Sequence, residues 1–133
     1  MAPPFRLLIV DDEADITQVL KMGMEAHGFR ADPFTNPESA LAKFKPGVYD
    51  MALLDIRMNG LTGFELFERL HAIDPKMKIC FITAYDFDNL EGYKQLYDIV
   101  PRHCYLRKPL DLPQIVKLVR QELGEKEPAL HNN

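Results

Sequence analysis

Five short apolar runs alternate along the chain with longer segments of helical period, and this alternation limits the folds that the chain can adopt. The runs predicted as strands are residues 5–10, 29–34, 48–54, 78–84 and 103–106. Strands that read as continuous apolar runs and are separated by helices are typical of a parallel sheet covered on both faces. We therefore expect an α/β fold built from five consecutive β–α units.

Capping signals indicate where several helices begin. Thr62 and Glu65 have the spacing of a capping box, in which each side chain bonds to the other residue's backbone, and they open a helix that runs to about residue 71. Asp111 and Gln114 have the same spacing before the last helix, and Asn36 begins a shorter one. A further helix is expected at 89–97. The strand at 29–34 is the weakest prediction, because it contains a proline that cannot donate to a ladder.

The size and charge of the chain restrict its class. Its 133 residues suffice for one domain, which we place at 1–123, with a flexible tail at 124–133. A net charge of −4 disfavours direct nucleic-acid binding. No apolar run approaches the ~20 residues of a membrane span, and no secretory signal is recognisable, so a cytoplasmic location is expected.

The cysteines and histidines show no metal-binding spacing. Cys80 and Cys104 are 24 residues apart in apolar segments and form no CxxC motif. We expect two buried, reduced thiols, with neither a zinc site nor a disulfide. The four histidines are dispersed along the chain.

Polar residues follow four of the predicted strands at their carboxyl ends. Asp11 and Asp12 follow the first strand, Asp55 ends the third, Thr83 ends the fourth, and Lys108 follows the fifth. Ligands of open parallel sheets bind at this edge. Clustered carboxylates need a counter-charge and suit Mg²⁺, while a lysine and a hydroxyl complete a receptor for a tetrahedral oxyanion. The pattern therefore favours phosphoryl chemistry on a carboxylate.

Each of these residues also has an ordinary structural interpretation. Paired aspartates after a strand are often helix caps, and Asp55 alone has the same explanation. Thr83 could simply end a strand, and Lys108 could be a solvated charge. The coincidence of all of them at strand carboxyl ends is what argues for a site.

Four motifs together give the chain a family resemblance. The segments LLIVDDE, LLDIRMNGLTGFEL, FITAY and YLRKPL, in this order, resemble the receiver domain of two-component response regulators. The resemblance extends from about residue 5 to residue 123. It implies a flavodoxin-like (βα)5 fold, a doubly wound parallel sheet with strand order 2-1-3-4-5. It also implies that Asp55 accepts a phosphoryl group from a histidine kinase, a phosphotransfer protein or a small acyl phosphate.

The resemblance assigns a metal site. Asp12 and Asp55 would ligate Mg²⁺ together with the backbone carbonyl of Arg57, and Asp11 would hold the metal mainly through water.

It also assigns phosphoryl-binding and switch residues. Lys108, Thr83 and the backbone N–H of Ala84 would bind the phosphoryl oxygens. Tyr105 matches a switch aromatic that turns inward when Thr83 moves, and Pro109 matches a proline that the family often carries as a cis peptide.

The chain departs from the family pattern in the loop after Asp55 and in the segment before Lys108. Asn59 stands where proline is usual, which implies a less rigid loop after Asp55. The interval from Thr83 to Lys108 is 25 residues, longer than expected, so the fourth helix or its loop should be extended. Arg57 and Tyr85 should flank the phosphoryl group, and we expect Arg57→Ala to change the rate of phosphoryl loss.

Several functions are compatible with these motifs. The first is a stand-alone receiver that catalyses only its own phosphorylation and dephosphorylation and acts through a downstream protein, as a monomer or a phosphorylation-dependent homodimer. The second is a receiver that belongs to a longer regulator or hybrid kinase. The third, an enzyme, is a phosphatase of the haloacid-dehalogenase type, which wants a DxD motif after the first strand. A nucleotide-binding module is weaker still, because no GxxxxGK loop follows that strand.

Overall fold

Five parallel strands form one sheet in the computed structural model, which describes residues 4–84 and 99–124, apart from the side chain of Arg102. The spatial order is β2-β1-β3-β4-β5, and every neighbouring pair is parallel. The strands are β1 (Arg6–Val10), β2 (Arg30–Phe34), β3 (Met51–Asp55), β4 (Lys78–Thr83) and β5 (Tyr105–Arg107). The predicted α/β fold and strand order are confirmed.

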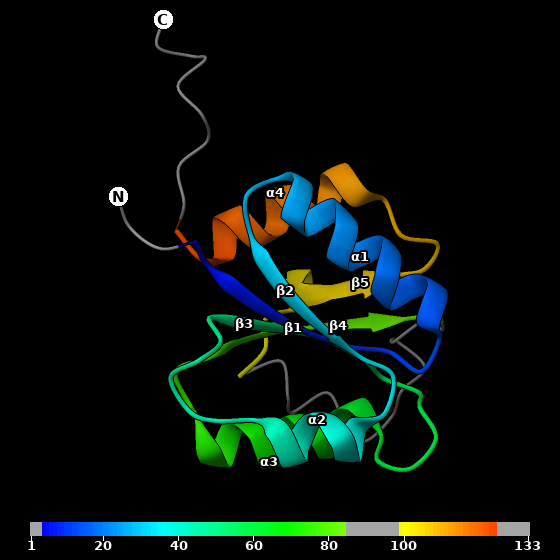
Figure 1. Ribbon diagram of the computed structural model, residues 1–133, viewed down its shortest axis with the longest axis vertical. Coiled ribbons are helices and arrows are strands. Elements are labelled where there is room, and N and C mark those ends of the chain that lie inside the picture. The colour runs from blue at the N-terminus through cyan, green and yellow to red at the C-terminus, as the bar shows by residue number, and fades with distance from the viewer. Residues whose placement is uncertain (1–3, 85–98, 125–133) are drawn as a thin grey trace, which may run out of the picture.

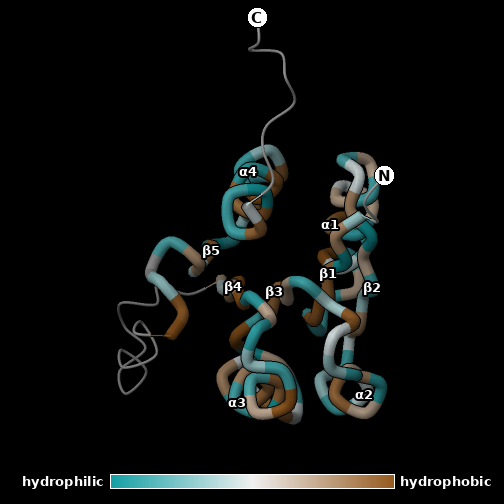
Figure 2. Tube along the Cα trace, turned by 90° about the vertical axis from the view of Figure 1, so that its left-hand side faces the viewer, coloured by the Kyte–Doolittle hydropathy of each residue, from teal (hydrophilic) through white to brown (hydrophobic). Residues whose placement is uncertain are grey.

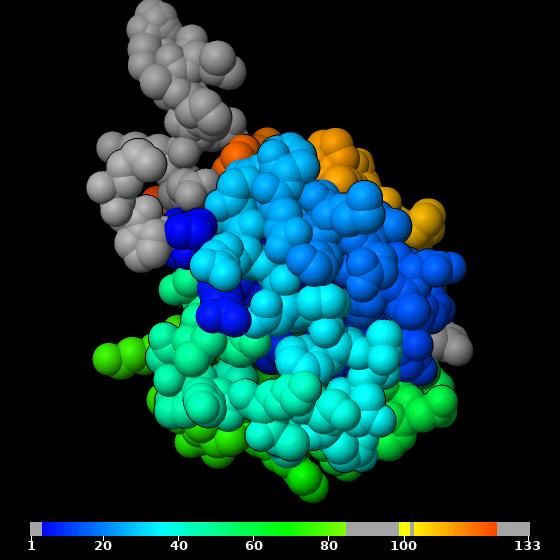
Figure 3. Space-filling model, viewed as in Figure 1, coloured from blue at the N-terminus to red at the C-terminus, as the bar shows by residue number. Residues whose placement is uncertain are grey.

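Helices cover both faces of this sheet. Helices α1 (Ala14–Ala26) and α4 (Leu112–Glu122) lie on one face, and α2 (Pro37–Lys43) and α3 (Gly63–Ile73) lie on the other (Figures 1 and 2). In the space-filling view, side chains of α1, β2 and α2 cover the side of the molecule that faces the viewer (Figure 3). Among the described residues, no helix combines the length and the apolar character that a membrane crossing needs.

The central strands supply much of the core. Residues 7–10 of β1 and 51–54 of β3 have no exposed surface. Burying one such aliphatic side chain contributes about 1.5–3 kcal/mol. Pro33 lies in β2, which is an edge strand, so its missing N–H leaves no gap in the sheet interior.

The beginning of β5 differs from the prediction. The apolar run suggested a strand at 103–106, whereas residues Arg102–Cys104 form the 3₁₀ turn η3 and the strand begins at Tyr105. The backbone N–H of Cys104 donates to the carbonyl of Pro101 at 2.9 Å, a turn bond that an extended ladder does not allow. The ladder starts where Tyr105 pairs with Phe81. The helix expected at 89–97 lies outside the described residues.

The predicted capping signals are largely observed. Thr62 Oγ1 accepts from the Glu65 N–H at 3.1 Å, and the Glu65 carboxylate accepts from the Thr62 N–H at 2.9 Å, which completes the capping box of α3. At α4 the Asp111 carboxylate accepts from the Gln114 N–H at 3.5 Å. Only this half of the second predicted box is recorded among the described residues.

Candidate functional site

Three carboxylates meet at the carboxyl edge of the sheet. Asp11 and Asp12 follow β1, and Asp55 is the last residue of β3, which pairs with β1. Each of the three offers an oxygen within 4.8 Å of the other two. The sheet therefore brings together the aspartates that the sequence pattern selected.

Two of these carboxylates are shielded from water. Asp11 has no exposed surface and Asp55 is 4% exposed, whereas Asp12 is exposed. Asp11 is held from both sides, because its Oδ1 accepts from the Glu13 N–H at 2.9 Å and its own N–H donates to the Phe34 carbonyl at 3.1 Å. Buried carboxylates are costly unless a cation or several donors accompany them.

Lys108 supplies a cation at this edge. Its Nζ lies 3.0 Å from Asp11 Oδ2 and 3.7 Å from Asp55 Oδ2, and its side chain is 13% exposed. Its backbone N–H donates to the Thr83 carbonyl at 2.7 Å, which fixes the chain after β5 to the end of β4. The Lys108–Pro109 peptide is cis, as expected.

One lysine does not neutralise the negative charge of three neighbouring carboxylates. Burial and then the neighbouring Asp11 carboxylate raise the pKa of Asp55 to about 7, although Lys108 opposes this shift. Burial alone would lower the pKa of Lys108, but Asp11, Asp55 and Glu13 raise it above its ordinary value. The aspartates therefore favour an additional cation, and their oxygen donors are the hard ligands that Mg²⁺ prefers.

A pocket of about 220 Å³ opens beside these side chains. This is room for several water molecules, or for a hydrated ion and a small anion. The pocket is lined by Asp12, Glu13, Asp55, Arg57, Ala84 and Lys108.

Glu13 is the pocket residue to which the sequence reasoning gave no role. Its carboxylate lies 3.7 Å from Lys108 Nζ, and its side chain is largely exposed. The sequence feature that could have pointed to Glu13 is its position as the third consecutive acidic residue in LLIVDDE.

The two predicted switch residues, Thr83 and Tyr105, are both buried. Thr83 has no exposed surface, and Tyr105 is 6% exposed with its ring centroid 5.3 Å from that of Phe81. The Tyr105 ring therefore already occupies a buried position in this structure. Tyr85 lies outside the described residues.

Helix α3 begins in direct contact with the end of β3. The Gly63 N–H donates to the Ile56 carbonyl at 2.8 Å. A Cβ at Gly63 would meet the Asp55 carbonyl oxygen and the Ile56 Cα, so only glycine allows this approach. In the preceding loop, Gly60 has a φ of 87°, a conformation that favours glycine.

Comparison with known proteins agrees with this geometry. Residues 7–120 match the model of the response regulator receiver domain. The chain belongs to this family. The receiver spans about half the length of the transcriptional regulatory protein PcoR of Escherichia coli, to which it is 32% identical over 117 residues, or 86% of the receiver and 50% of PcoR.

Two further relatives match the receiver over nearly their whole length. Sporulation initiation phosphotransferase F of Bacillus subtilis is 28% identical, with coverage of 89% of the receiver and 93% of that protein. The structure of the response regulator TrrA of Thermotoga maritima, in complex with Mg²⁺ and BeF, is 30% identical with a TM-score of 0.74. That match covers 90% of the receiver and 98% of TrrA.

Proposed function

We propose that the receiver accepts a phosphoryl group on the Asp55 carboxylate and thereby changes a surface that other proteins contact. The observation that carries this proposal is the position of Asp55, which lines the small pocket with its carboxylate 3.7 Å from the Lys108 ammonium group. The donor would be the phosphohistidine of a kinase or phosphotransfer protein, or a small acyl phosphate.

The reaction is a displacement at phosphorus. An Asp55 oxygen forms the new P–O bond, while the bond from phosphorus to the donor's imidazole nitrogen or acyl oxygen breaks, and its electron pair leaves with the donor. Lys108 offsets the charge on the phosphoryl oxygens, because its ammonium group already faces Asp55. The Thr83 hydroxyl and the Ala84 N–H are assigned as further hydrogen-bond donors.

The carboxylate cluster fits a divalent cation. We assign Asp12, Asp55 and the Arg57 carbonyl as direct Mg²⁺ ligands, with Asp11 acting through water. The raised pKa of Asp55 supports this assignment, because it indicates that the carboxylates have too little positive charge around them when no metal is bound. When bound, Mg²⁺ would offset the negative charge shared by the carboxylates and the incoming group.

Phosphorylation would act as a switch through local charge. The new group adds about −1.5 to −2 charges at pH 7. We assign Thr83 and Tyr105 to the residues that respond, and β5 and α4 to the surface whose partner contacts change. The receiver would act on a downstream protein rather than on nucleic acid, and its catalysis would be confined to its own phosphorylation and dephosphorylation.

The receiver resembles both longer regulators and single-domain proteins, so this chemistry could serve in either context. PcoR is about twice as long as the matched region, whereas phosphotransferase F is of similar length. The receiver would therefore serve within a longer regulator or as a separate relay protein. The family match favours both settings over the phosphatase alternative.

Intact mass after incubation with acetyl phosphate tests the proposal. We expect one added phosphoryl group when Mg²⁺ is present, and none without Mg²⁺ or in Asp55→Asn. Glu68→Gln, an exposed substitution on α3, serves as the control and should be modified like the parent.

Two results would contradict the proposal. One is an adduct that survives in Asp55→Asn. The other is a parent chain that neither gains an adduct nor binds beryllofluoride in the presence of Mg²⁺. Beryllofluoride mimics the bound phosphoryl group, so its binding distinguishes rapid loss of the phosphoryl group from a failure to accept it.

A further inference from the structure

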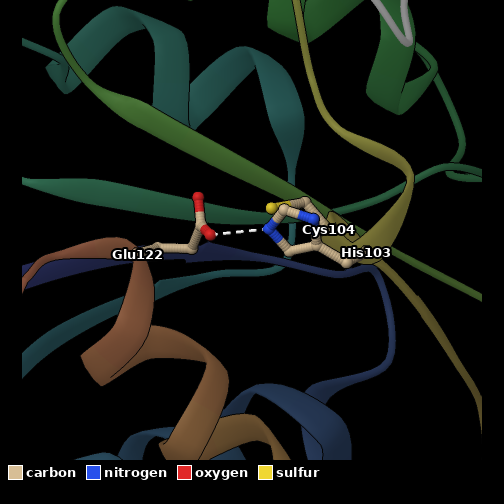
Figure 4. Close-up of side chains that lie close together, drawn as sticks. All are labelled: His103, Cys104 and Glu122. Carbon is tan, nitrogen blue, oxygen red and sulfur yellow. Dashed lines mark hydrogen bonds and ion pairs between the residues drawn. The ribbon is translucent and has the colours of Figure 1, made fainter.

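A second group of metal-ligating side chains lies near the amino end of β5, at the end of the sheet opposite the aspartates. His103, Cys104 and Glu122 each offer a ligand atom within 4.8 Å of the other two. Figure 4 shows the His103 ring and the Cys104 sulfur beside the Glu122 carboxylate. Cys104 precedes β5, whereas Lys108 follows it, so this group is separated from the phosphoryl site by the length of the strand.

We propose that His103 Nε2, Cys104 Sγ and a Glu122 carboxylate oxygen form a binding site for a transition-metal dication of the zinc class. The proposal does not depend on phosphorylation of Asp55. The site would join the end of α4 to the turn before β5.

The donor atoms select this class of metal. Thiolate sulfur and imidazole nitrogen are ligands for Zn²⁺ and its neighbours, whereas Mg²⁺ and Ca²⁺ require oxygen. Three protein ligands with one position left to solvent is a recurrent arrangement for zinc. This site therefore differs in selectivity from the all-carboxylate cluster at the other edge.

The distances need only a small adjustment. Zinc lies about 2.0–2.3 Å from nitrogen, oxygen and sulfur ligands, so ligand atoms around one ion are roughly 3–4 Å apart. His103 Nε2 and Glu122 Oε2 are 2.7 Å apart and would separate slightly. The His103 side chain is 57% exposed, which leaves its ring room to turn.

The surroundings combine a buried thiol with an open side. Cys104 has no exposed surface, and the pairing of Phe81 with Tyr105 places Cys80 beside it on the neighbouring strand. Glu122 is 17% exposed and also lines a neighbouring pocket of about 230 Å³. An ion would therefore enter from the His103 and Glu122 side and meet sulfur at the protein interior.

Helix α4 supplies an independent reason for a cation here. Glu122 is its last residue, and the carboxyl end of a helix carries partial negative charge. A carboxylate at this position is unfavourable unless a positive group faces it. A divalent metal ion held between Glu122 and His103 would supply that positive group.

Cobalt(II) titration of the reduced, metal-free chain tests the site. A thiolate ligand gives Co²⁺ an intense near-ultraviolet charge-transfer band, which a carboxylate site lacks. Tetrahedral geometry gives visible bands that are much stronger than those of a six-coordinate carboxylate site. We expect one equivalent of Co²⁺ to develop both signals and Zn²⁺ to displace it. Asp12→Asn, which alters the other cluster, should leave them unchanged.

Variants then assign the ligands. His103→Gln and Glu122→Gln should weaken Co²⁺ binding at least about tenfold. Cys104→Ser should abolish the charge-transfer band, whereas Cys80→Ser, its matched buried control, should retain it. His27→Gln, an exposed histidine on another element, should bind like the parent.

The assignment is overturned by any of three results. They are the absence of the thiolate band in the parent chain, a Co²⁺ affinity in His103→Gln equal to that of the parent, or equal loss of the band in Cys80→Ser and Cys104→Ser. Because His103 is exposed, its substitution should leave the fold intact. Phosphorylation by acetyl phosphate in His103→Gln should match that of the parent, which separates failure here from failure at Asp55.

Discussion

The ammonium nitrogen of Lys108 lies 3.0 Å from Oδ2 of Asp11, a carboxylate with no exposed surface. Removing the ammonium group leaves this buried charge without its cation. We therefore expect Lys108→Met to lower the free energy of unfolding of the metal-free chain by about 1–3 kcal/mol. Saturating Mg²⁺ should recover most of the loss, because it supplies the missing positive charge.

Urea unfolding with and without Mg²⁺ measures this effect. Lys21→Met is the control, because Lys21 and Glu25 form an exposed pair at 2.8 Å, and such pairs contribute only about 0.3–0.5 kcal/mol. Equal losses in the two variants, or a loss in Lys108→Met that Mg²⁺ leaves unchanged, would contradict the proposed role of Lys108.

The raised pKa of Asp55 predicts how stability changes with pH. The folded chain holds the Asp55 proton up to about pH 7, whereas an unfolded aspartate loses it near pH 4. The folded form therefore binds more protons than the unfolded form in this interval. The contribution of Asp55 to the free energy of unfolding of the metal-free chain falls as pH rises from about 4 to about 7.

Asp55→Asn should remove this decline and stabilise the metal-free chain at neutral pH, by about 1–3 kcal/mol. The measurement is the urea midpoint at a series of pH values in the presence of a chelator. A parent and variant whose midpoints change in parallel would show that Asp55 ionises normally.

The apparent affinity for Mg²⁺ should depend on pH for the same reason. Protons and metal compete for the ionised carboxylate, so the affinity should rise as pH increases and level off above about 7. Isothermal titration calorimetry across this pH range measures the affinity. An affinity that is independent of pH would show that Asp55 is not a ligand of the metal.

Arg57 lines the pocket while its side chain is exposed. We expect Arg57→Ala to change the rate of phosphoryl loss several-fold, because a guanidinium group beside the pocket affects both charge and water access. Mg²⁺ affinity should change little, since the assigned ligand is the backbone carbonyl. Decay of the phosphorylated mass measures the rate, with Arg69→Ala on α3 as control, and identical decay in the parent and Arg57→Ala would refute the prediction.

The contact between Gly63 and the end of β3 predicts a coupled loss of stability and activity. Gly63→Ala should destabilise the chain by about 1–3 kcal/mol, because the new methyl group displaces the Asp55 carbonyl. Phosphorylation should slow at the same time. Gly47→Ala is the control, because Gly47 has a φ of 81° and open space around it, so its substitution should strain only the backbone.

Both effects are read from the same samples, by urea unfolding and by intact mass after acetyl phosphate. If Gly47→Ala slowed phosphorylation as much as Gly63→Ala, general destabilisation would account for both.

The sequence predicted the fold well where local signals and burial agree. Apolar runs identified β1 and β3 because both faces of a central parallel strand are covered. Pro33 weakened the prediction of β2, which forms nonetheless because it is an edge strand. The start of β5 was missed because apolarity does not distinguish a strand from a buried 3₁₀ turn. The bond from the Cys104 N–H to the Pro101 carbonyl decides it.

The two candidate sites were predictable to different degrees. Asp11, Asp55 and Lys108 could be selected from the sequence, because carboxyl ends of neighbouring parallel strands converge. The group of His103, Cys104 and Glu122 could not, because Glu122 follows 18 positions later and meets the others only where α4 ends against the sheet. Spacing rules for metals describe local ligands, whereas this group depends on tertiary packing.

The bond between the Lys108 N–H and the Thr83 carbonyl has a mechanical consequence. It fastens the ends of β4 and β5 to each other through backbone rather than through side chains. Any displacement of Thr83 therefore pulls directly on the peptide that leads into α4. A shift at the end of β4 would therefore be passed on by main-chain atoms.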